Sequence, residues 1–82
     1  MTAVLPEEDF VRHVARALVD EPDAVEVTAT EDDRGILLEL RVADPDLGKV
    51  IGRQGRMARA LRLLLTASSA KHGRHVHLDI ID

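Results

Sequence analysis

Two glycines and two arginines stand at a spacing that suits the binding of an anion. The stretch reads Val50-Ile51-Gly52-Arg53-Gln54-Gly55-Arg56. Because glycine lacks a Cβ atom, Gly52 and Gly55 can take backbone angles closed to other residues and let a ligand approach the chain closely. A helix that begins just after Gly55 directs unpaired backbone N–H groups and a partial positive charge at the same point. Arg53 and Arg56 add full charges and Gln54 adds a neutral donor, so the stretch predicts a loop that clamps a phosphate.

The charges of the chain are unevenly distributed around that stretch. Residues 47–78 hold seven basic residues and no acid, whereas residues 1–46 hold thirteen acids and four bases. Although the formal net charge is -4, such asymmetry creates a local positive field that attracts phosphates. Two glycines at this spacing also occur in ordinary turns, and arginines also occur on solvated helix faces. The absence of glutamate from the basic half favours a nucleic-acid partner over that simpler explanation.

The length and composition narrow the function classes further. Eighty-two residues suffice for one domain, spanning 1–82, whose small core needs regular packing or a partner. The chain has no cysteine, which removes disulfide and thiolate chemistry and fits a reducing compartment. It has no apolar run long enough to cross a bilayer, and its first residues lack the basic-then-apolar order of a signal peptide. We therefore expect a cytoplasmic protein.

Hydrophobic periodicity predicts a helix and two strands in the first half. Pro6 suits a first helical position, and Glu21-Pro22 ends the helix. The apolar stripe of this helix consists of Phe10, Val11, Val14, Ala15, Leu18 and Val19. Residues 25–30 and 36–42 alternate apolar and polar side chains, as half-buried strands do. The polar turn between them is short, so the two strands should form an antiparallel hairpin.

The second half is predicted to contain two helices around the glycine-rich stretch. Asp44-Pro45 is typical of an N-cap followed by a first-position proline, and it opens a short helix that stops at Gly52. A longer helix should run from about Arg56 to Lys71, with Gly73 as its natural end. Its expected inner face consists of Met57, Leu61, Leu64, Leu65 and Ser68. Off that face lies a ridge able to follow a phosphate backbone, formed by Arg56, Arg59 and Arg62.

A third strand completes the predicted fold. Residues 75–81 alternate again, and the long crossover from the second strand favours a parallel pairing with it. The order of elements is then α-β-β-α-α-β. Three strands that are apolar on one face need helices to cover that face, which predicts a two-layer α+β domain with a three-stranded sheet.

The glycine-rich stretch, set between two helices in this order of elements, resembles the signature of KH domains. In that family the G-x-x-G loop clamps about four nucleotides of single-stranded RNA backbone, and the order of elements matches the type II KH arrangement. The resemblance covers essentially the whole chain. In so short a chain one longer string is similar, more narrowly, to the small bacterial single-domain KH family called KhpA: Gly48-Lys49-Val50-Ile51-Gly52-Arg53-Gln54-Gly55-Arg56.

Each residue of this region has an expected role in binding single-stranded RNA. Phosphates should be held by Gly52, Arg53, Gln54 and Gly55. Additional positive charge should come from Lys49, Arg56 and Arg59. Bases should be seated by Val50, Ile51 and Met57.

The resemblance to KhpA also implies partners and a cellular role. It implies a homodimer, an association with a larger KH-containing protein called KhpB, and action with KhpB as an RNA chaperone. That activity would be linked to cell elongation and division, and so to cell shape and cell wall biogenesis. An alternative from a different class is a protein–protein interaction module with a KH fold, in which RNA binding is incidental.

Other chemistries find little support in the sequence. His72, His75 and His77 lie close together, but with no cysteine and only Asp79 nearby they make a poor metal site. No hydrolase, phosphate-loop or paired-carboxylate motif accompanies the basic half, so we expect neither catalysis nor a cofactor. The single aromatic residue, Phe10, is predicted to lie in the core, which would exclude a base-stacking platform of exposed rings.

Three consecutive leucines in the last predicted helix cannot all face the core, because successive helical residues turn by roughly 100°. Leu64 and Leu65 are expected on the inner face, whereas Leu63 falls on the outer side near Thr66 and Ala70. Leu63 is then either a scattered surface residue or part of a helix–helix interface that two copies share about a two-fold axis. We hypothesise that it lies in such an interface.

Overall fold

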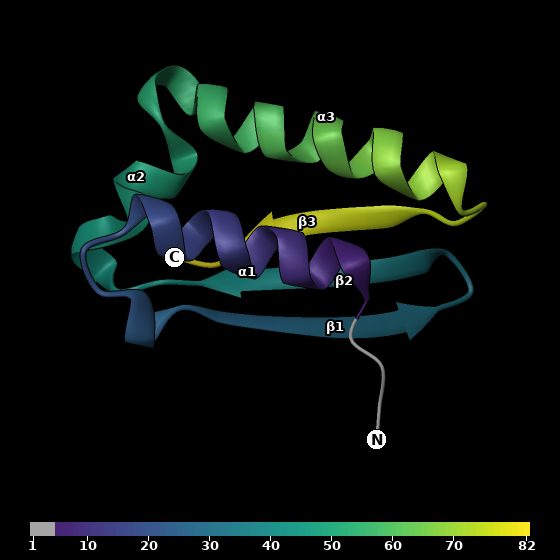
Figure 1. The fold of residues 1–82 in the computed structure, drawn as a ribbon, viewed down its shortest axis with the longest axis horizontal. Coiled ribbons are helices and arrows are strands. Elements are labelled where there is room, and N and C mark those ends of the chain that lie inside the picture. The colour runs from purple at the N-terminus through teal and green to yellow at the C-terminus, as the bar shows by residue number, and fades with distance from the viewer. Residues whose placement is uncertain (1–4) are drawn as a thin grey trace.

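Helices and strands follow one another in the expected order in the computed structural model, which describes residues 5–82 (Figure 1). The main elements are α1 (Pro6–Leu18), β1 (Glu26–Asp32), β2 (Gly35–Arg41), α2 (Leu47–Ile51), α3 (Arg56–Lys71) and β3 (Val76–Ile80). Single turns of 3₁₀ helix lie between them, namely η1 (Pro22–Ala24), η2 (Asp44–Asp46) and η3 (Arg53–Gly55). The predicted α-β-β-α-α-β order and the predicted limits of α3 are confirmed.

The strand β2 lies at the centre of the sheet. β1 runs antiparallel to it, with Val27 opposite Leu40, and β3 runs parallel to it, with Leu38 opposite Leu78. All four of these side chains are buried, because the alternation of the strands places them on the same face. Both predicted strand pairings are confirmed. Among the described residues β3 pairs only with β2, so its outer edge is open.

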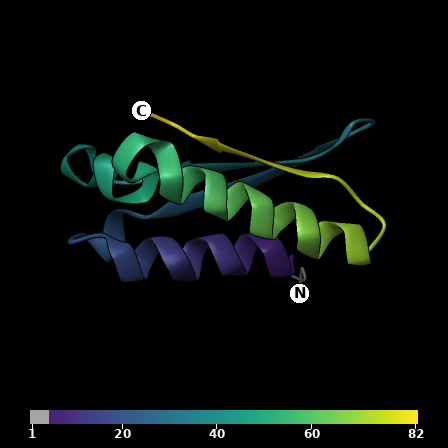
Figure 2. The ribbon, with the colours of Figure 1, turned by 90° about the horizontal axis from the view of Figure 1, so that it is seen from above.

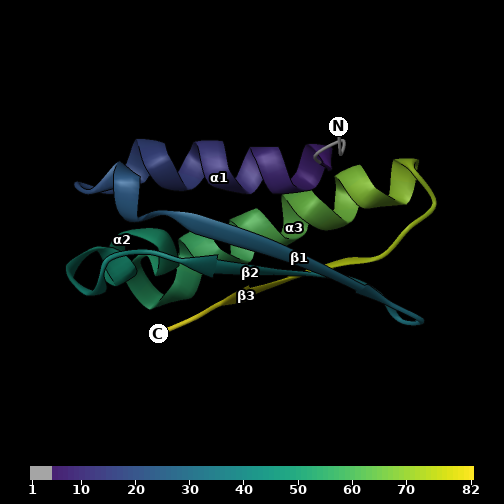
Figure 3. The ribbon, with the colours of Figure 1, turned by 90° about the horizontal axis from the view of Figure 1, so that it is seen from below.

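Both long helices cover the same face of the sheet. Figure 2 shows α1 and α3 side by side, with the sheet along the upper side of the view and α1 lowest, and Figure 3 shows the same two layers from the opposite side. α1 packs against β1, α3 packs against β3, and the two helices contact each other. No helix within residues 5–82 covers the other face of the sheet. This is the predicted two-layer α+β arrangement.

The face that α3 turns to the sheet differs from the predicted one. Its buried residues are Ala58, Leu61, Leu65 and Ser69. Leu64, which is expected on the inner face, is 54% exposed, and Ser68 is only partly buried. Helix positions separated by three or four residues lie in one row along the helix, and the buried residues of α3 form such a row. Leu64 and Ser68 belong to the neighbouring row, which points towards α1.

The prediction that Phe10 lies in the core is wrong. The apolar residues of α1 occupy two adjacent rows of the helix, and only the row of Val11, Ala15 and Val19 is buried. Phe10 is 36% exposed and borders a cleft of about 240 Å³ between α1 and α3. The residues that line this α1–α3 cleft are Glu7, Phe10, Leu64, Leu65 and Ser68.

The helix α3 ends just before Gly73, as the sequence predicts. Gly73 has φ +67°, the left-handed region that favours glycine. Its N–H donates to Ala70 O at 3.2 Å, and the N–H of Arg74 donates to Ser69 O at 3.1 Å. These two bonds are those of a Schellman motif, which satisfies the last carbonyl groups of a helix and reverses the chain. The reversal leads the chain into β3 and brings Arg74 towards α1.

A buried ion pair joins the first turn of α1 to the connection between α3 and β3. Arg74 Nη2 donates to Glu7 Oε1 at 2.7 Å, and the Glu7 side chain is fully buried. Burial by itself raises the pKa of Glu7, but the hydrogen bond from Arg74, a backbone hydrogen bond and the charge of Arg74 together outweigh it, and the pKa lies below its ordinary value. The pair therefore holds together two segments that are far apart in the sequence.

Among residues 5–82, none of the helices combines the length and the apolar character that crossing a bilayer requires.

Removing the cation of the buried pair should cost more stability than removing the anion. Arg74→Met leaves the carboxylate of Glu7 buried without a partner, and breaking a buried pair in this way costs about 3 to 5 kcal/mol. Glu7→Gln should cost less, because the Arg74 side chain is 28% exposed and can turn to water. Urea unfolding of both variants at neutral pH measures the two losses in the free energy of unfolding.

The pH dependence checks the cause of that difference. Because folding lowers the pKa of Glu7 below its ordinary value of 4.5, the ionised pair contributes fully above that pH. Its contribution is lost as the pH falls below 4.5 and through the lower folded pKa. The gap in stability between the parent protein and Arg74→Met should therefore narrow in acid. A gap that stays constant down to about pH 3 would contradict this account of the pair.

Candidate nucleic-acid interface

The glycine-rich stretch forms a tight connection between α2 and α3. The short helix α2 ends where the N–H of Gly52 donates to Gly48 O at 2.9 Å. A single 3₁₀ turn, η3, follows, and the N–H of Gly55 donates back to Gly52 O at 3.1 Å. The helix α3 begins at Arg56. The predicted position of the G-x-x-G loop between two helices is confirmed, and we call residues 52–55 the G-x-x-G loop.

Position 52 accepts only glycine for two separate reasons. Gly52 has φ +79°, a conformation that other residues rarely adopt. A Cβ atom there would also lie 2.7 Å from Met57 Cβ and 2.8 Å from Met57 N. The backbone of Gly52 therefore packs directly against the start of α3, and this close approach brings the two helices together.

One residue of the loop, Gln54, is held in a strained conformation. Gln54 has φ +57° and ψ +26°, and it is the one non-glycine residue with a positive φ among residues 5–82. The next residue, Gly55, also lies in the left-handed region, with φ +74°. A left-handed conformation costs about 1 to 2 kcal/mol for an L residue. Strain of this kind gathers at ligand-binding sites, and the loop is therefore the strongest candidate for function.

Three arginines lie in the loop or close to it in the sequence, and none of them forms an ion pair within residues 5–82. Arg59 Nη2 donates to Gln54 O at 2.7 Å, so its side chain fixes the carbonyl group of the strained residue. Because that acceptor is a neutral carbonyl oxygen, this hydrogen bond does not compensate the charge of Arg59. Arg53 and Arg56 are exposed, and neither has an acidic partner within residues 5–82. These charges add to the partial positive charge at the N-terminus of α3.

The apolar residues expected to seat bases divide into two kinds. Ile51 and Met57 are partly buried, so part of each side chain faces solvent next to the loop. Val50 is fully buried in the core. The prediction that Val50 seats a base is therefore wrong, because no base can reach it. Its side chain instead anchors α2 to the hydrophobic core.

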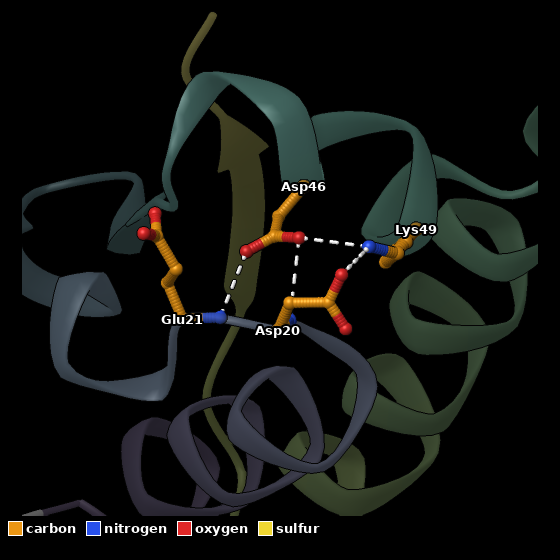
Figure 4. A network of polar contacts seen from close by, with 4 residues as sticks. All are labelled: Asp20, Glu21, Asp46 and Lys49. Carbon is orange, nitrogen blue, oxygen red and sulfur yellow. Dashed lines mark hydrogen bonds and ion pairs between the residues drawn. The ribbon is translucent and has the colours of Figure 1, made fainter.

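Lys49 lies in a cluster of carboxylates at the start of α2 (Figure 4). Its ammonium group donates to Asp20 Oδ2 at 2.6 Å and to Asp46 Oδ1 at 3.0 Å. The Asp46 side chain, which is 2% exposed, also accepts the backbone N–H groups of Asp20 and Glu21 at 3.2 and 3.1 Å. We call Asp20, Asp46 and Lys49 the Asp46 cluster, and it joins the chain that follows α1 to the start of α2.

The pKa values of this cluster are shifted in the direction that favours its charges. The hydrogen bond from Lys49 lowers the pKa of Asp46 against the effect of burial, and the two backbone N–H groups lower it further. The hydrogen bond to Asp20, followed by that to Asp46, raises the pKa of Lys49. Both Asp46 and Lys49 therefore stay ionised at neutral pH.

Sequence reasoning misses the role of Asp46. The sequence assigns an N-cap to Asp44, but the N-cap of η2 is Ala43, Asp44 is the first residue of that turn, and the buried acid is Asp46. The one signal in the sequence is the spacing of Asp46 and Lys49, three residues apart, which lets helical side chains pair. The partner groups at Asp20 and Glu21 lie about 25 residues away and leave no local pattern.

The three arginines expected to form a ridge along α3 do not share one environment. Arg62 turns to the sheet, where its Nε donates to the carbonyl oxygen of Leu78 in β3 at 3.3 Å. It therefore spans the gap between α3 and the neighbouring strand. Arg59 turns to the loop, and Arg56 stays exposed. The ridge is thus a set of three arginines with different neighbours.

The histidines near the end of α3 do not converge. His72 lies beside Ser68 O, at 3.0 Å from its Nδ1, whereas the exposed His75 and His77 lie just before β3 and within it. Across the part of the chain that the structure describes, no group of three or more His, Asp or Glu side chains is placed to hold a metal ion.

The fold and the loop together define the class of protein. Three helices and a three-stranded mixed sheet in α-β-β-α-α-β order, with a G-x-x-G loop between the last two helices, make a type II KH domain. A family model described as "KhpA/KhpB, KH domain" matches residues 8–80. The chain therefore belongs to the KhpA/KhpB family of KH domains.

Curated relatives carry the name "RNA-binding protein KhpA". The protein of that name from Treponema pallidum is 49% identical over 79 residues, which is 96% of this chain and 99% of the relative. The relative from Halalkalibacterium halodurans is 51% identical over 73 residues, covering 89% of this chain and 96% of its own. The relative from Streptomyces coelicolor is 48% identical over 75 residues, covering 92% and 91%.

Alanine substitutions at the glycines should separate steric from conformational constraint. Gly55→Ala meets no atom within 4 Å but keeps a positive φ, so it should lower the free energy of unfolding by about 1 to 2 kcal/mol. Gly52→Ala adds the clash with Met57 and should cost more. The matched control is Gly48→Ala in α2, which meets no atom and should be neutral or stabilising by up to about 1 kcal/mol. Urea unfolding measures all three, and equal losses for Gly52→Ala and Gly55→Ala would contradict the close approach.

Proposed function

We propose that this protein binds single-stranded RNA by clamping its backbone with the G-x-x-G loop. The observation that carries the proposal is the loop itself, in which Gln54 is held in the left-handed region between two glycines of positive φ and Arg59 is bonded to the Gln54 carbonyl group. A preformed loop binds without the entropic cost of ordering itself. The name of the relatives, RNA-binding protein KhpA, supports the same ligand.

The phosphates of the RNA approach the loop at the start of α3. Glycine at position 52 removes the side chain that would keep a phosphate away from the backbone. The N-terminus of a 16-residue helix supplies N–H donors and partial positive charge, and Arg53 and Arg56 supply full charges. A KH loop of this type holds about four nucleotides of backbone.

The bases turn to the apolar side of the clamp. Ile51 and Met57 are partly exposed next to the loop and offer an aliphatic surface to an unpaired base. The one aromatic side chain, Phe10, borders Leu64 instead, and Leu64 lies nine residues beyond Gly55 in the sequence. At 1.5 Å per helical residue that separation is about 14 Å, so the binding of bases at the loop rests on aliphatic contacts. Since paired bases are not available for such contacts, single strands are the preferred ligand.

The cellular role that we propose follows from membership of the KhpA/KhpB family. The protein acts in the cytoplasm as an RNA chaperone, together with a KhpB-like partner, and this activity supports cell elongation and division. Because KH loops act on the backbone, such a protein can serve many RNA molecules. No enzymatic step is part of this proposal.

Reversing the charge of the clamp should abolish RNA binding while the fold stays intact. Arg53 and Gln54 are exposed, and Asp tolerates the left-handed conformation at position 54 better than most residues. The double variant Arg53→Asp, Gln54→Asp should lose about 100-fold or more in affinity, since hydrogen bonds to charged groups are worth about 1.5 to 3 kcal/mol each. Fluorescence anisotropy with a labelled single-stranded RNA measures the loss.

The matched control carries the same change of charge on a distant surface. Arg34→Glu with Thr30→Glu replaces two exposed residues at the hairpin between β1 and β2, which lies at the opposite end of the sheet from α2 (Figure 1), and alters the net charge equally. It should keep RNA affinity within about threefold, because exposed charges farther away than a Debye length of about 8 Å are screened. If both double variants lose the same RNA affinity, the loss reflects the net charge of the protein and not the clamp. Unchanged affinity in the folded clamp variant would favour the protein–protein interaction module.

We also propose that the outer side of α3 forms the homodimer interface. Leu63 is 71% exposed, on the outer side as predicted, and the exposed Leu64 extends the apolar surface beside it. The neighbouring Thr66, Ala67 and Ala70 are exposed and small, so a second helix can approach closely. A two-fold axis would let both copies use the same surface, and a KhpB-like partner would use it in place of the second copy.

Placing a charge on that surface should give a folded monomer. Leu63→Asp would bury an unpaired carboxylate in the interface, which costs several kcal/mol, while the monomer keeps a cooperative thermal transition. The matched control is Leu37→Asp, which changes another exposed leucine, on β2, and should leave the dimer intact. Sedimentation velocity measures both variants. If Leu63→Asp sediments as the parent protein does, the interface lies elsewhere.

A further inference from the structure

The Asp46 cluster has a geometry that the proposed clamp does not explain. Both carboxylate oxygens of the buried Asp46 are occupied, one by the Asp20 N–H and Lys49 Nζ and the other by the Glu21 N–H. Lys49 also reaches Asp20 at 2.6 Å. Figure 4 shows these groups converging between the loop after α1 and the start of α2. Asp46 is thus a fixed point between two segments about 25 residues apart in the sequence.

The segment that this cluster holds is the one that leads into the clamp. α2 is five residues long, and isolated helices shorter than about 12 residues are unstable in water. Its direction must therefore come from contacts with the rest of the protein. Val50 supplies one such contact through the core, and the Asp46 cluster supplies another at the first turn. The last bond of α2, from Gly52 N–H to Gly48 O, places the first glycine of the loop.

The charge of the cluster opposes a phosphate. Two carboxylates and one ammonium group give Asp20, Asp46 and Lys49 a formal net charge of about -1 at neutral pH. The third N–H of Lys49 has no partner among the described residues, yet a phosphate that approached it would also approach two carboxylates. By contrast, neither Arg53 nor Arg56 forms an ion pair within residues 5–82.

We infer that Lys49 is a positioning residue: it compensates the charge of the buried Asp46, whose bonds to the backbone N–H groups of Asp20 and Glu21 fix α2 and so preset the G-x-x-G loop for RNA, and it takes no phosphate itself. This inference rests on the proposed RNA binding and changes the role that the sequence suggests for Lys49. Arg53, Arg56 and Arg59 are then the cations that meet the backbone.

The salt dependence of RNA binding tells a positioning residue from a phosphate contact. For single strands the log of the binding constant falls against log salt with a slope of about -0.7 per contact. Three arginines give about -2, and Lys49→Met should leave that slope unchanged. The RNA affinity of Lys49→Met should fall about tenfold if only about a tenth of the molecules hold the loop in its binding conformation. Lys49→Arg should restore affinity, because guanidinium also bridges carboxylates. A slope that is shallower in Lys49→Met than in the parent would overturn the inference.

Two controls complete the binding experiment. Asp20→Asn leaves Lys49 bound to the buried Asp46 and should change the affinity by less than about threefold, because surface ion pairs contribute little. If Asp20 merely held Lys49 back from RNA, this variant would instead bind more tightly and with a steeper slope. Lys49→Gln serves the same test if Lys49→Met does not fold.

Amide exchange tests the inference without RNA. The Gly52 amide, bonded to Gly48 O, reports on α2, and the Ile36 amide, bonded to His75 O, reports on the sheet. In Lys49→Met the Gly52 amide should exchange faster while the Ile36 amide keeps its rate; a global loss of stability would accelerate both. Unchanged exchange at Gly52, or unchanged RNA affinity in the folded variant, overturns the inference. If the parent protein binds no RNA, the proposed function fails, and the exchange rates still decide whether Lys49 fixes α2.

Discussion

The backbone of Gly52 lies so close to Met57 that a Cβ atom at position 52 would come within 2.7 Å of Met57 Cβ. This contact requires the chain to turn sharply between α2 and α3, so that the two form separate helices. Only residues 52–55 separate the end of α2 from the start of α3. Within that short connection Gln54 and Gly55 both take left-handed angles. The left-handed conformation of Gln54, the one strained residue of the connection, thus belongs to the same tight turn as the close approach of Gly52 to Met57.

The scaffold keeps this strained turn in place by holding the elements on both sides of it. On one side, α2 is too short to be stable by itself, and it depends on the burial of Val50 and on the hydrogen bonds of Asp46. On the other side, the long helix α3 packs Leu61 and Leu65 against the sheet. The loop thus inherits its geometry from contacts outside it, which is the condition under which strain persists in a folded protein.

The features of the fold that the sequence predicts are those encoded by local patterns: apolar periodicity locates the helices and strands, and glycines mark the ends of α2 and α3. Periodicity does not tell which of two adjacent apolar rows a helix buries, because that depends on the neighbouring helix; Phe10 and Leu64 are exposed for this reason. Long-range polar contacts are equally hidden. Glu7 and Arg74 are separated by 67 residues, and Asp46 bonds to groups about 25 residues away. The candidate site is recognisable because its glycines and arginines lie in one stretch, whereas the groups that orient that stretch come from elsewhere.

The uneven use of the cations explains how an acidic chain can present a positive site. Lys49 and Arg74 lie against carboxylates, so they add little to the field around the loop. Arg59 donates to a neutral carbonyl oxygen, which does not compensate its charge, and Arg53 and Arg56 have no acidic partner among the described residues. The positive field is therefore concentrated at the G-x-x-G loop and the first half of α3. Because acids dominate the first half of the chain, much of the remaining surface would repel a polyanion, and the proposed site is the part of the molecule that would attract one.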